Sequence, residues 1–241
     1  MCMSERLSKT KINDYLQCPR KYKYRHVDNI SSSQNKNFKI GIDVHKIAEK
    51  CIKEWQSDDS IDFLETLLNF ESEYSGNYQE HCLHLSEFFK EKLVNNNYVV
   101  FCVEEKLDSK KYNFSGYSDI VLEKDDELTV IDYKTGKSSS VENYVTELCY
   151  YKMLIEDQYP DKNVKYAAIF FTKEGKYNEL TFTDDESGIV NCSKAEYESK
   201  IDLMYEVRDK IEKKQFNPNR QFFCKNCEFK KYCDNEGLLT L

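Results

Sequence analysis

Three consecutive runs of β-branched and aromatic residues, separated only by short polar turns, constrain the fold of this chain most. They are YVVFCVEEKL (98–107), KYNFSGYSDIVLE (111–123) and ELTVIDYKTG (127–136). Runs of this length and composition are typical of β-strands, and turns as short as DSKK and KDD favour antiparallel pairing of the strands that they join. The middle of the chain is therefore predicted to form a compact sheet.

Segments with the periodicity of an amphipathic helix flank these strands. We expect helices over 9–26, with Thr10 as its cap, and over 41–55, 60–71, 78–94, 141–159 and 194–214, with further strands over 163–172 and 176–183. The chain has only 7 Gly and 3 Pro, too few for the many sharp turns of a sandwich or barrel of short strands. The element order predicts an α/β fold, with a mixed central sheet and helices on both sides.

Length and composition are those of a globular protein. The chain has 241 residues and no dividing linker, so we expect a single domain over 1–241. Apolar residues make up 40% of it and charged residues 32%, which excludes a disordered tail. No apolar run approaches the ~18 residues of a bilayer span, and MCMSERLSKT at the start lacks the apolar core of a signal peptide. We expect a cytoplasmic protein without membrane association.

The net charge of −8 hides two basic stretches. Residues 6–25 carry seven cations against one acid, and residues 208–231 carry eight cations against three acids. Tyrosines and phenylalanines are interleaved with the cations in both stretches. Cations that pair with phosphates beside rings that stack on bases suit a nucleic-acid channel. Solvated helix faces above a half-buried tyrosine stripe are the alternative interpretation.

The most informative segment for chemistry is GYSDIVLEKDDELTVIDYKTGK (116–137). Asp132 and Lys134 are two apart on one predicted strand and therefore share a face, which Asp119 on the neighbouring strand can join. Two carboxylates hold a hard divalent cation, and a lysine supplies a point charge for an attacking hydroxide or a phosphate oxygen. This set suits phosphodiester hydrolysis. An exposed Asp–Lys pair without chemistry is the alternative.

Three of the 10 cysteines are clustered near the C-terminus as Cys224-x2-Cys227-x5-Cys233. A closed all-thiolate metal site needs a fourth ligand, and Cys18 is the candidate. Such a site would join the two ends of the chain. The spacing serves zinc and an iron–sulfur cluster equally, and three unligated thiols are the remaining alternative.

Six segments in the same order resemble a PD-(D/E)XK nuclease of the RecB type. They are INDYLQCPRKYKYRHV (12–27), GIDVHKIAE (41–49), GYSD (116–119), VIDYKTGK (130–137), ELCYYKML (147–154) and CKNCEFKKYC (224–233). The resemblance runs through almost the whole chain and implies a restriction-endonuclease-like core.

The resemblance also implies roles for individual residues. The ligands of a catalytic Mg²⁺ or Mn²⁺ ion would be His45, Asp119, Asp132 and the main-chain carbonyl of Tyr133. Lys134 would steady the nucleophilic water and the transition state. In the helix that follows, Glu147 and Tyr151 would face the active site, although the family normally has glutamine where this chain has Glu147.

A neighbouring acid, Glu104 or Glu105, could add a carboxylate near the metal, but an exposed pair at a strand end is the simpler interpretation. We therefore leave both outside the predicted site.

For Cys18, Cys224, Cys227 and Cys233 the resemblance implies a four-iron, four-sulfur cluster, with zinc as the alternative. Residues 1–30 and 215–241 would then form a clasp that binds both the cluster and DNA.

The resemblance implies a metal-dependent deoxyribonuclease, an exonuclease acting on single-stranded DNA ends. Relatives of this kind work in CRISPR adaptation, in recombinational repair and in phage genomes, so proteins of those systems are the expected partners. The alternative is a non-catalytic nucleic-acid-binding or assembly module that has kept the nuclease fold.

Overall fold

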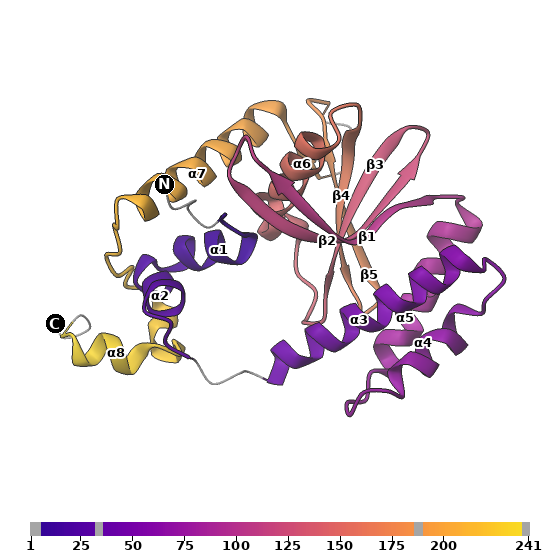
Figure 1. Ribbon diagram of the computed structural model, residues 1–241, viewed down its shortest axis with the longest axis horizontal. Helices are drawn as coiled ribbons and strands as arrows, with labels where there is room; N and C mark the ends of the chain where they lie inside the picture. Colours follow the sequence, from indigo (N-terminus) through magenta and orange to yellow (C-terminus); the bar gives the residue numbers. More distant parts are fainter. Residues whose placement is uncertain (1–5, 32–35, 186–189, 238–241) are drawn as a thin grey trace. The chain divides into compact units, whose positions relative to one another are not determined.

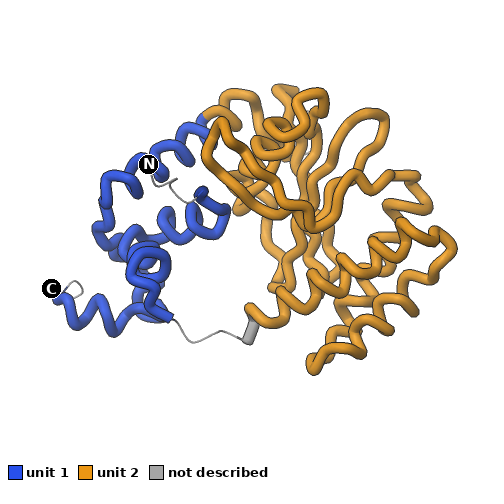
Figure 2. Tube along the Cα trace, viewed as in Figure 1, with its two compact units in different colours: residues 1–34, 199–241 blue, residues 35–198 orange. Residues whose placement is uncertain are grey.

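The structure is a computed structural model, drawn in Figure 1, and it describes residues 6–31, 36–185 and 190–237. The chain divides into two compact units, coloured separately in Figure 2. Unit 1 combines the two ends of the chain, Met1–Gln34 and Ser199–Leu241, and unit 2 is Asn35–Glu198. The predicted range 1–30 and the predicted range 215–241 both belong to unit 1, apart from residues 1–5 and 238–241, which lie outside the described residues.

Within the described residues, unit 2 contains a six-stranded mixed sheet in the order β1-β2-β3-β4-β5-β6. The strands are β1 (Val99–Ser109), β2 (Phe114–Lys124), β3 (Glu127–Lys134), β4 (Asn163–Phe171), β5 (Lys176–Phe182) and β6 (Asn191–Cys192). Pairing is antiparallel for β1/β2, β2/β3 and β4/β5, and parallel for β3/β4 and β5/β6. The predicted mixed sheet flanked by helices is confirmed.

Helices α3, α4 and α5 cover one face of this sheet (Figure 1). Their bounds, with those of the following π-helical turn η2, are α3 (Lys36–Ser57), α4 (Phe63–Glu71), α5 (Gln79–Phe89) and η2 (Lys90–Asn95). Ile47, Leu67 and Leu85, one from each α-helix, are fully buried with Ile120 and Ile131 of the sheet. Each such side chain contributes about 2 kcal/mol of burial free energy, so this core fixes α3 against β2 and β3.

Helix α6 (Val145–Gln158) packs on the other face, after a short 3-10 turn, η3 (Val141–Tyr144). Val121 and Val130 alternate with the residues that face α3 to α5 and are fully buried on this side. Side chains of α6 pack closely on the β2 backbone, because a Cβ placed on Gly116 would lie 3.3 Å from the Tyr150 ring. The site residues of α6 are thereby held against the sheet.

The β2/β3 ladder ends before the two strands do. The last paired residues are Ile120 and Ile131. Beyond this pair, β2 remains paired with β1 on its other side, and β3 remains paired with β4. Asp119 and Asp132 are the next residues on each strand beyond this last pair. Side chains at this point can enter the space between the separating strands.

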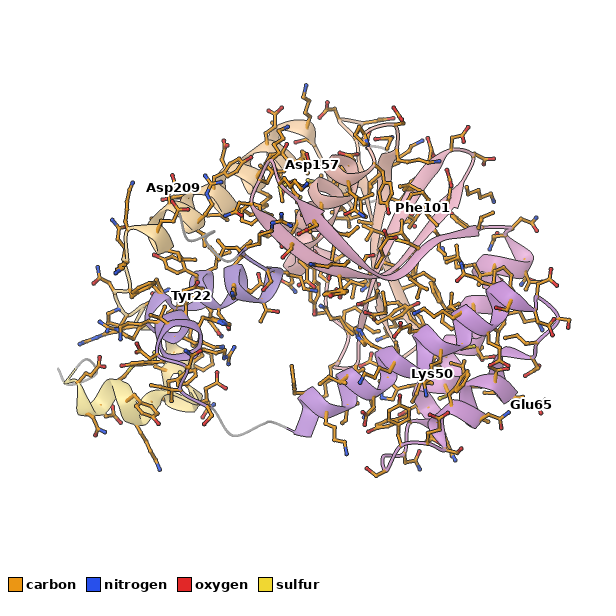
Figure 3. The ribbon with its side chains drawn as sticks, viewed as in Figure 1. Tyr22, Lys50, Glu65, Phe101, Asp157 and Asp209 are labelled. Atoms are coloured by element: carbon orange, nitrogen blue, oxygen red, sulfur yellow. The ribbon has the colours of Figure 1, made fainter. Side chains whose placement is uncertain are left out.

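Unit 1 contains α1 (Lys9–Gln17), α2 (Pro19–Tyr22), the π-helical turn η1 (Lys23–Val27), the 3-10 turn η4 (Phe222–Asn226), α8 (Lys230–Asn235) and most of α7 (Lys194–Glu212). Tyr15, Tyr22 and Phe216 form a ring cluster, with Tyr22 stacked on Phe216 at 5.9 Å between centroids; Tyr22 is labelled in Figure 3. The Tyr15 hydroxyl also donates to the carbonyl of Gln215 at 2.6 Å. These contacts join the N-terminal helices to the C-terminal segment.

The single helix predicted over 9–26 is wrong in two respects. Cys18 is extended, with φ −163° and ψ 114°, so α1 ends at Gln17 and α2 starts at Pro19. Proline disfavours the helical conformation of the residue before it, which explains the break. The cap is Ser8, whose side chain accepts from the Lys11 N–H, and not Thr10.

Among the described residues, none of the helices combines the length and apolar character that crossing a membrane requires.

The Asp14 carboxylate is the buried ionic centre of unit 1. It accepts from Arg25 at 2.7 and 2.6 Å and from His26 Nε2 at 2.8 Å, and Lys21 Nζ lies 3.3 Å away. Burial alone would raise the pKa of Asp14, but the bond to His26 and the charges of Arg25 and Lys21 lower it. The folded pKa therefore lies below the unfolded pKa, and Asp14 stabilises unit 1 above its unfolded pKa of about 3.9.

We predict that Asp14→Asn reduces the free energy of unfolding by about 2 kcal/mol at pH 7, because Arg25 and Lys21 lose a buried carboxylate and His26 loses its hydrogen-bond acceptor. The difference from wild type should shrink as pH falls through the unfolded pKa towards the lowered folded value. Denaturant unfolding of both proteins between about pH 3 and pH 7, at one fixed salt concentration, measures this difference in unfolding free energy. A difference that is constant over this range would contradict the role given to Asp14.

Candidate active site

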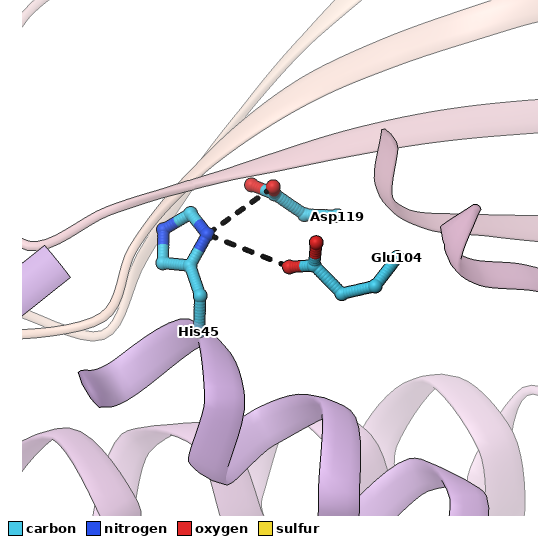
Figure 4. Close-up of side chains that lie close together, drawn as sticks. All are labelled: His45, Glu104 and Asp119. Atoms are coloured by element: carbon cyan, nitrogen blue, oxygen red, sulfur yellow. Dashed lines mark ion pairs between the residues drawn. The ribbon is translucent and has the colours of Figure 1, made fainter. Parts of the chain in front are cut away.

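His45, Glu104 and Asp119 form a cluster of possible metal ligands (Figure 4). One ligand atom from each lies within 4.8 Å of the others. His45 Nδ1 is 3.2 Å from Asp119 Oδ1 and 3.7 Å from Glu104 Oε1. The imidazole comes from α3, and the carboxylates come from β2 and β1. Two of these three residues, His45 and Asp119, belong to the site that the sequence predicted.

Glu104 reaches this cluster through an unusual backbone conformation. The register pairs Val103 with Ile120 and Glu105 with Ser118, so Glu104 lies opposite Asp119. Its φ of +45° is in the left-handed region, which a non-glycine residue rarely adopts inside a strand. Backbone strain of this kind is concentrated at functional sites. Glu104 is not part of the site predicted from the sequence, and the cross-strand register is the signal that could have included it.

Glu105 makes different contacts. Its carboxylate accepts from Gln158 Nε2 at 3.1 Å and from the Tyr159 hydroxyl. It therefore ties β1 to the end of α6 and is not part of the cluster with His45.

The peptide groups of Tyr133 connect the cluster to β3. The Tyr133 N–H donates to Asp119 Oδ2 at 2.6 Å, and the Tyr133 carbonyl accepts from His45 Nε2 at 3.1 Å. The Asp119 side chain thus accepts a hydrogen bond from a backbone N–H of β3 at the point where the ladder with β2 has ended. The carbonyl that the sequence predicted as a metal ligand lies next to the predicted imidazole ligand.

On β3 and α6 the structure brings together the other predicted residues. Lys134 Nζ lies 2.6 Å from Asp132 Oδ2 and 2.6 Å from Glu147 Oε1, and the Tyr151 hydroxyl donates to Asp132 Oδ1 at 3.1 Å. Glu147 and Tyr151 are one helical turn apart and share the face of α6 that covers β3. Asp132 and Glu147 are buried, with 1% and 8% of their surfaces exposed. The ammonium of Lys134 is therefore held between two carboxylates.

The pKa of His45 reflects its acidic surroundings. Burial would lower it, but Asp119, Glu104 and the charge of Asp132 together raise it to about 10. Both ring nitrogens lie near oxygen atoms, Nε2 at the Tyr133 carbonyl and Nδ1 at the Asp119 carboxylate. Burial also raises the pKa of Glu104, against the opposing effect of His45. The carboxylates around His45 therefore favour a positive charge at this position.

The predicted site residues thus lie in two adjoining groups. Asp132 is outside the 4.8 Å cluster, although its charge acts on His45. The cluster around Asp119 and the group around Lys134 meet at the backbone of Tyr133, which lies between Asp132 and Lys134 in the chain.

The four predicted cysteine ligands all belong to unit 1. Cys18 Sγ accepts from the Asn219 N–H at 3.4 Å, and Cys224 Sγ lies 3.8 Å from the Asn219 carbonyl. Burial raises the pKa of the Cys233 thiol, and neighbouring Cys18 and Cys227 raise it further. Among the described residues, the cysteine sulfurs do not form a group of three within the 4.8 Å found for His45, Glu104 and Asp119.

Comparisons with known proteins give one family. The model of the PD-(D/E)XK nuclease superfamily matches residues 6–234. A solved structure titled "Crystal structure of SSO0001" matches 92% of this chain and 96% of its own, at 14% identity and a TM-score of 0.33. The search of curated proteins gives no match. Because the family model covers nearly the whole chain, the protein belongs to the PD-(D/E)XK nuclease superfamily.

Proposed function

We propose that this protein is a Mg²⁺- or Mn²⁺-dependent deoxyribonuclease whose active site is built from His45, Asp119, Asp132, Lys134 and Glu104. The observation that carries the proposal is the meeting of a carboxylate–imidazole cluster and the ion pair of buried Asp132 with Lys134 at one backbone position, Tyr133. Superfamily membership supports the same chemistry.

The donor set fits a hard divalent cation. Carboxylates of Glu104, Asp119 and Asp132, with the carbonyl of Tyr133, are oxygen ligands of the kind that Mg²⁺ and Mn²⁺ prefer. In the two groups together, the carboxylates outnumber the cationic side chains by two. We assign ligation to His45, Asp119, Asp132 and the Tyr133 carbonyl, with Glu104 as an additional acid. When bound, such a cation polarises a phosphoryl oxygen and lowers the pKa of a water molecule.

Lys134 supplies the positive charge for the reacting groups. Its ammonium is fixed by Asp132 and Glu147, so its position is set before DNA binds. A preorganised charge stabilises an attacking hydroxide and the developing negative charge on the phosphate. Tyr151 orients Asp132 through its hydroxyl.

We propose an exonuclease acting on single-stranded DNA ends as the specific activity. The C-terminal basic stretch supports it, because Arg220, Lys225 and Lys231 are exposed in the same stretch as Phe222, which is 88% exposed. An exposed ring among cations suits unpaired bases and their phosphates. In the N-terminal stretch, by contrast, Lys21 and Arg25 are paired with Asp14. CRISPR adaptation, phage metabolism and recombinational repair are the proposed settings, with their proteins as partners.

For unit 1 we propose a four-iron, four-sulfur cluster held by Cys18, Cys224, Cys227 and Cys233, with zinc as the alternative. The shared contacts with Asn219 and the influence of Cys18 and Cys227 on Cys233 support it. In this proposal the whole chain works as one nuclease domain, and residues 1–30 and 215–241 form a clasp that binds the cluster and DNA.

Lys134→Ala should lower the rate of single-stranded DNA digestion in Mn²⁺ by about 10²-fold or more, because it removes a preorganised charge from the transition state. Binding of a labelled oligonucleotide in the presence of chelator should weaken by about three- to tenfold at low salt, much less than the rate falls, because one cation near the phosphates is lost. The matched control is Lys165→Ala, which removes a lysine that pairs with Glu127 at the opposite end of β3. Digestion by Lys134→Ala at the wild-type rate would contradict the role given to Lys134, whereas no digestion by either protein would support the non-catalytic binding module.

Glu147→Gln should strengthen single-stranded DNA binding by about three- to tenfold at low salt, because it removes a negative charge next to Lys134 while keeping an acceptor oxygen. Fluorescence anisotropy at increasing salt measures the change, which should fade as screening increases. Glu65→Gln on α4, labelled in Figure 3, is an exposed control with the same change of charge. Weaker binding by Glu147→Gln would contradict a site facing phosphates.

Anaerobically purified protein should contain about four irons and four sulfides per chain and absorb in the near-visible region. Cys18→Ser and Cys224→Ser should each lose this absorbance and lower the thermal midpoint of unfolding, because a cluster stabilises the fold that holds it. Cys51→Ser, a change at a thiol buried in the core of unit 2, is the control and should keep the metal content. Colourless protein with about one zinc per chain would favour the zinc alternative.

A further inference from the structure

The end of β3 has a neighbouring strand on one side. Beyond Ile131 the ladder with β2 has ended, while pairing with β4 continues to Lys134 and Phe171. Lys134 is the last residue of β3, and a long loop follows it. The hydrogen bonds of its main chain therefore depend on the residue that follows the end of β4.

The residue after Phe171 is Thr172, which is fully buried and binds the main chain of Lys134 twice. Its N–H donates to the Lys134 carbonyl at 2.9 Å, and its hydroxyl donates to the same oxygen at 3.3 Å. A carbonyl with two donors on one residue is held in both distance and direction.

Helix α5 fixes Thr172 in turn. His81 Nδ1 lies 2.8 Å from the Thr172 hydroxyl oxygen, and His84 Nδ1 lies 3.1 Å from the Thr172 carbonyl. Because the hydroxyl uses its proton on Lys134, the His81 ring donates its Nδ1–H. His81 is 6% exposed, and burial lowers its pKa, which keeps the ring neutral. The two histidines are three residues apart and share one face of α5.

The turn that follows Thr172 also holds the loop after Lys134. Glu174 accepts from the Ser138 N–H at 3.1 Å and from its hydroxyl at 2.6 Å. Gly175 has φ +64°, and a Cβ there would lie 2.8 Å from the His84 ring. A side chain at position 175 would thus push on the histidine that holds Thr172, so glycine is required for two reasons.

We infer that Thr172, supported by His81, is a positioning residue for the proposed reaction: it holds the main chain of Lys134 so that its ammonium stays between Asp132 and Glu147. This inference rests on the proposed function for its effect on rate. Its structural part, the position of the Lys134 side chain, can be measured separately.

Thr172→Val keeps the backbone N–H and the side-chain volume but removes the hydroxyl. We expect kcat for single-stranded DNA in Mn²⁺ to fall about tenfold, the usual size of an effect of residues that orient a site, with KM changed by less than about twofold. Thr172→Ser restores the hydroxyl and should recover most of kcat. The control is Thr181→Val on β5, which removes a buried hydroxyl oxygen without a hydrogen-bond partner among the described residues.

A second measurement does not depend on activity. Acetylation of Lys134 by a water-soluble active ester, followed by peptide mass spectrometry, reports how firmly its ammonium is held. Thr172→Val should raise the acetylation rate of Lys134 several-fold relative to Lys165, whereas Thr172→Ser and Thr181→Val should stay near wild type. If Thr172→Val does not fold, His81→Leu removes the ring donor and His81→Asn restores an N–H, with the same two results expected.

The outcomes separate the two proposals. Wild-type protein that fails to digest DNA with Mg²⁺ or Mn²⁺ contradicts the proposed function, and the acetylation rates still decide on Thr172. A different result would overturn the positioning role: wild type digests DNA, but Thr172→Val has the same kcat and the same Lys134 acetylation rate as Thr181→Val. So would a Thr172→Ser protein as slow as Thr172→Val, because the loss would then not come from the hydroxyl.

Discussion

The site depends on the hydrogen bond from the Tyr133 N–H to Asp119 Oδ2. β2 and β3 separate beyond Ile120 and Ile131, and a backbone donor buried at this point would cost about 1–3 kcal/mol if it were left unsatisfied. Asp119 satisfies it with a side chain and keeps its second oxygen for His45. The Asp119 carboxylate thus satisfies the backbone where the ladder ends and also forms part of the candidate site. The same geometry turns the Tyr133 carbonyl towards His45, which brings α3 to the sheet at this position.

Much of this arrangement follows from local sequence patterns. Runs of β-branched and aromatic residues within 98–136 predicted the strands, and the spacing of Asp132 and Lys134 predicted a shared face, because a strand repeats every two residues. The pairing of Glu147 and Tyr151 with that face follows from helical periodicity on α6. Family resemblance was needed for His45, since a histidine on an amphipathic helix carries no signal of its own.

Other parts depend on contacts between residues far apart in the chain. Glu104 joins the cluster because its φ is positive and because the β1/β2 register sets it opposite Asp119, neither of which its sequence neighbours reveal. Thr172 looks like an ordinary strand residue until β4 is aligned with β3. The break at Cys18 was visible locally, in the proline that follows it, and was outweighed by the helical pattern on either side.

Glu147 stands where the RecB-type resemblance leads us to expect glutamine, and the difference between the two is one of charge. A glutamine would hold the Lys134 ammonium by one neutral acceptor, whereas Glu147 adds a second carboxylate at 2.6 Å. The lysine is then fixed more firmly, since a carboxylate adds a Coulomb attraction to the ammonium that a neutral amide lacks. The added negative charge opposes an approaching phosphate and favours a cation, so the same change that orders the lysine also increases the excess of carboxylates that a divalent ion would balance. Glu147 therefore has two opposing effects on the activity of such a site: it orders the Lys134 ammonium, and it repels the phosphates of the DNA backbone.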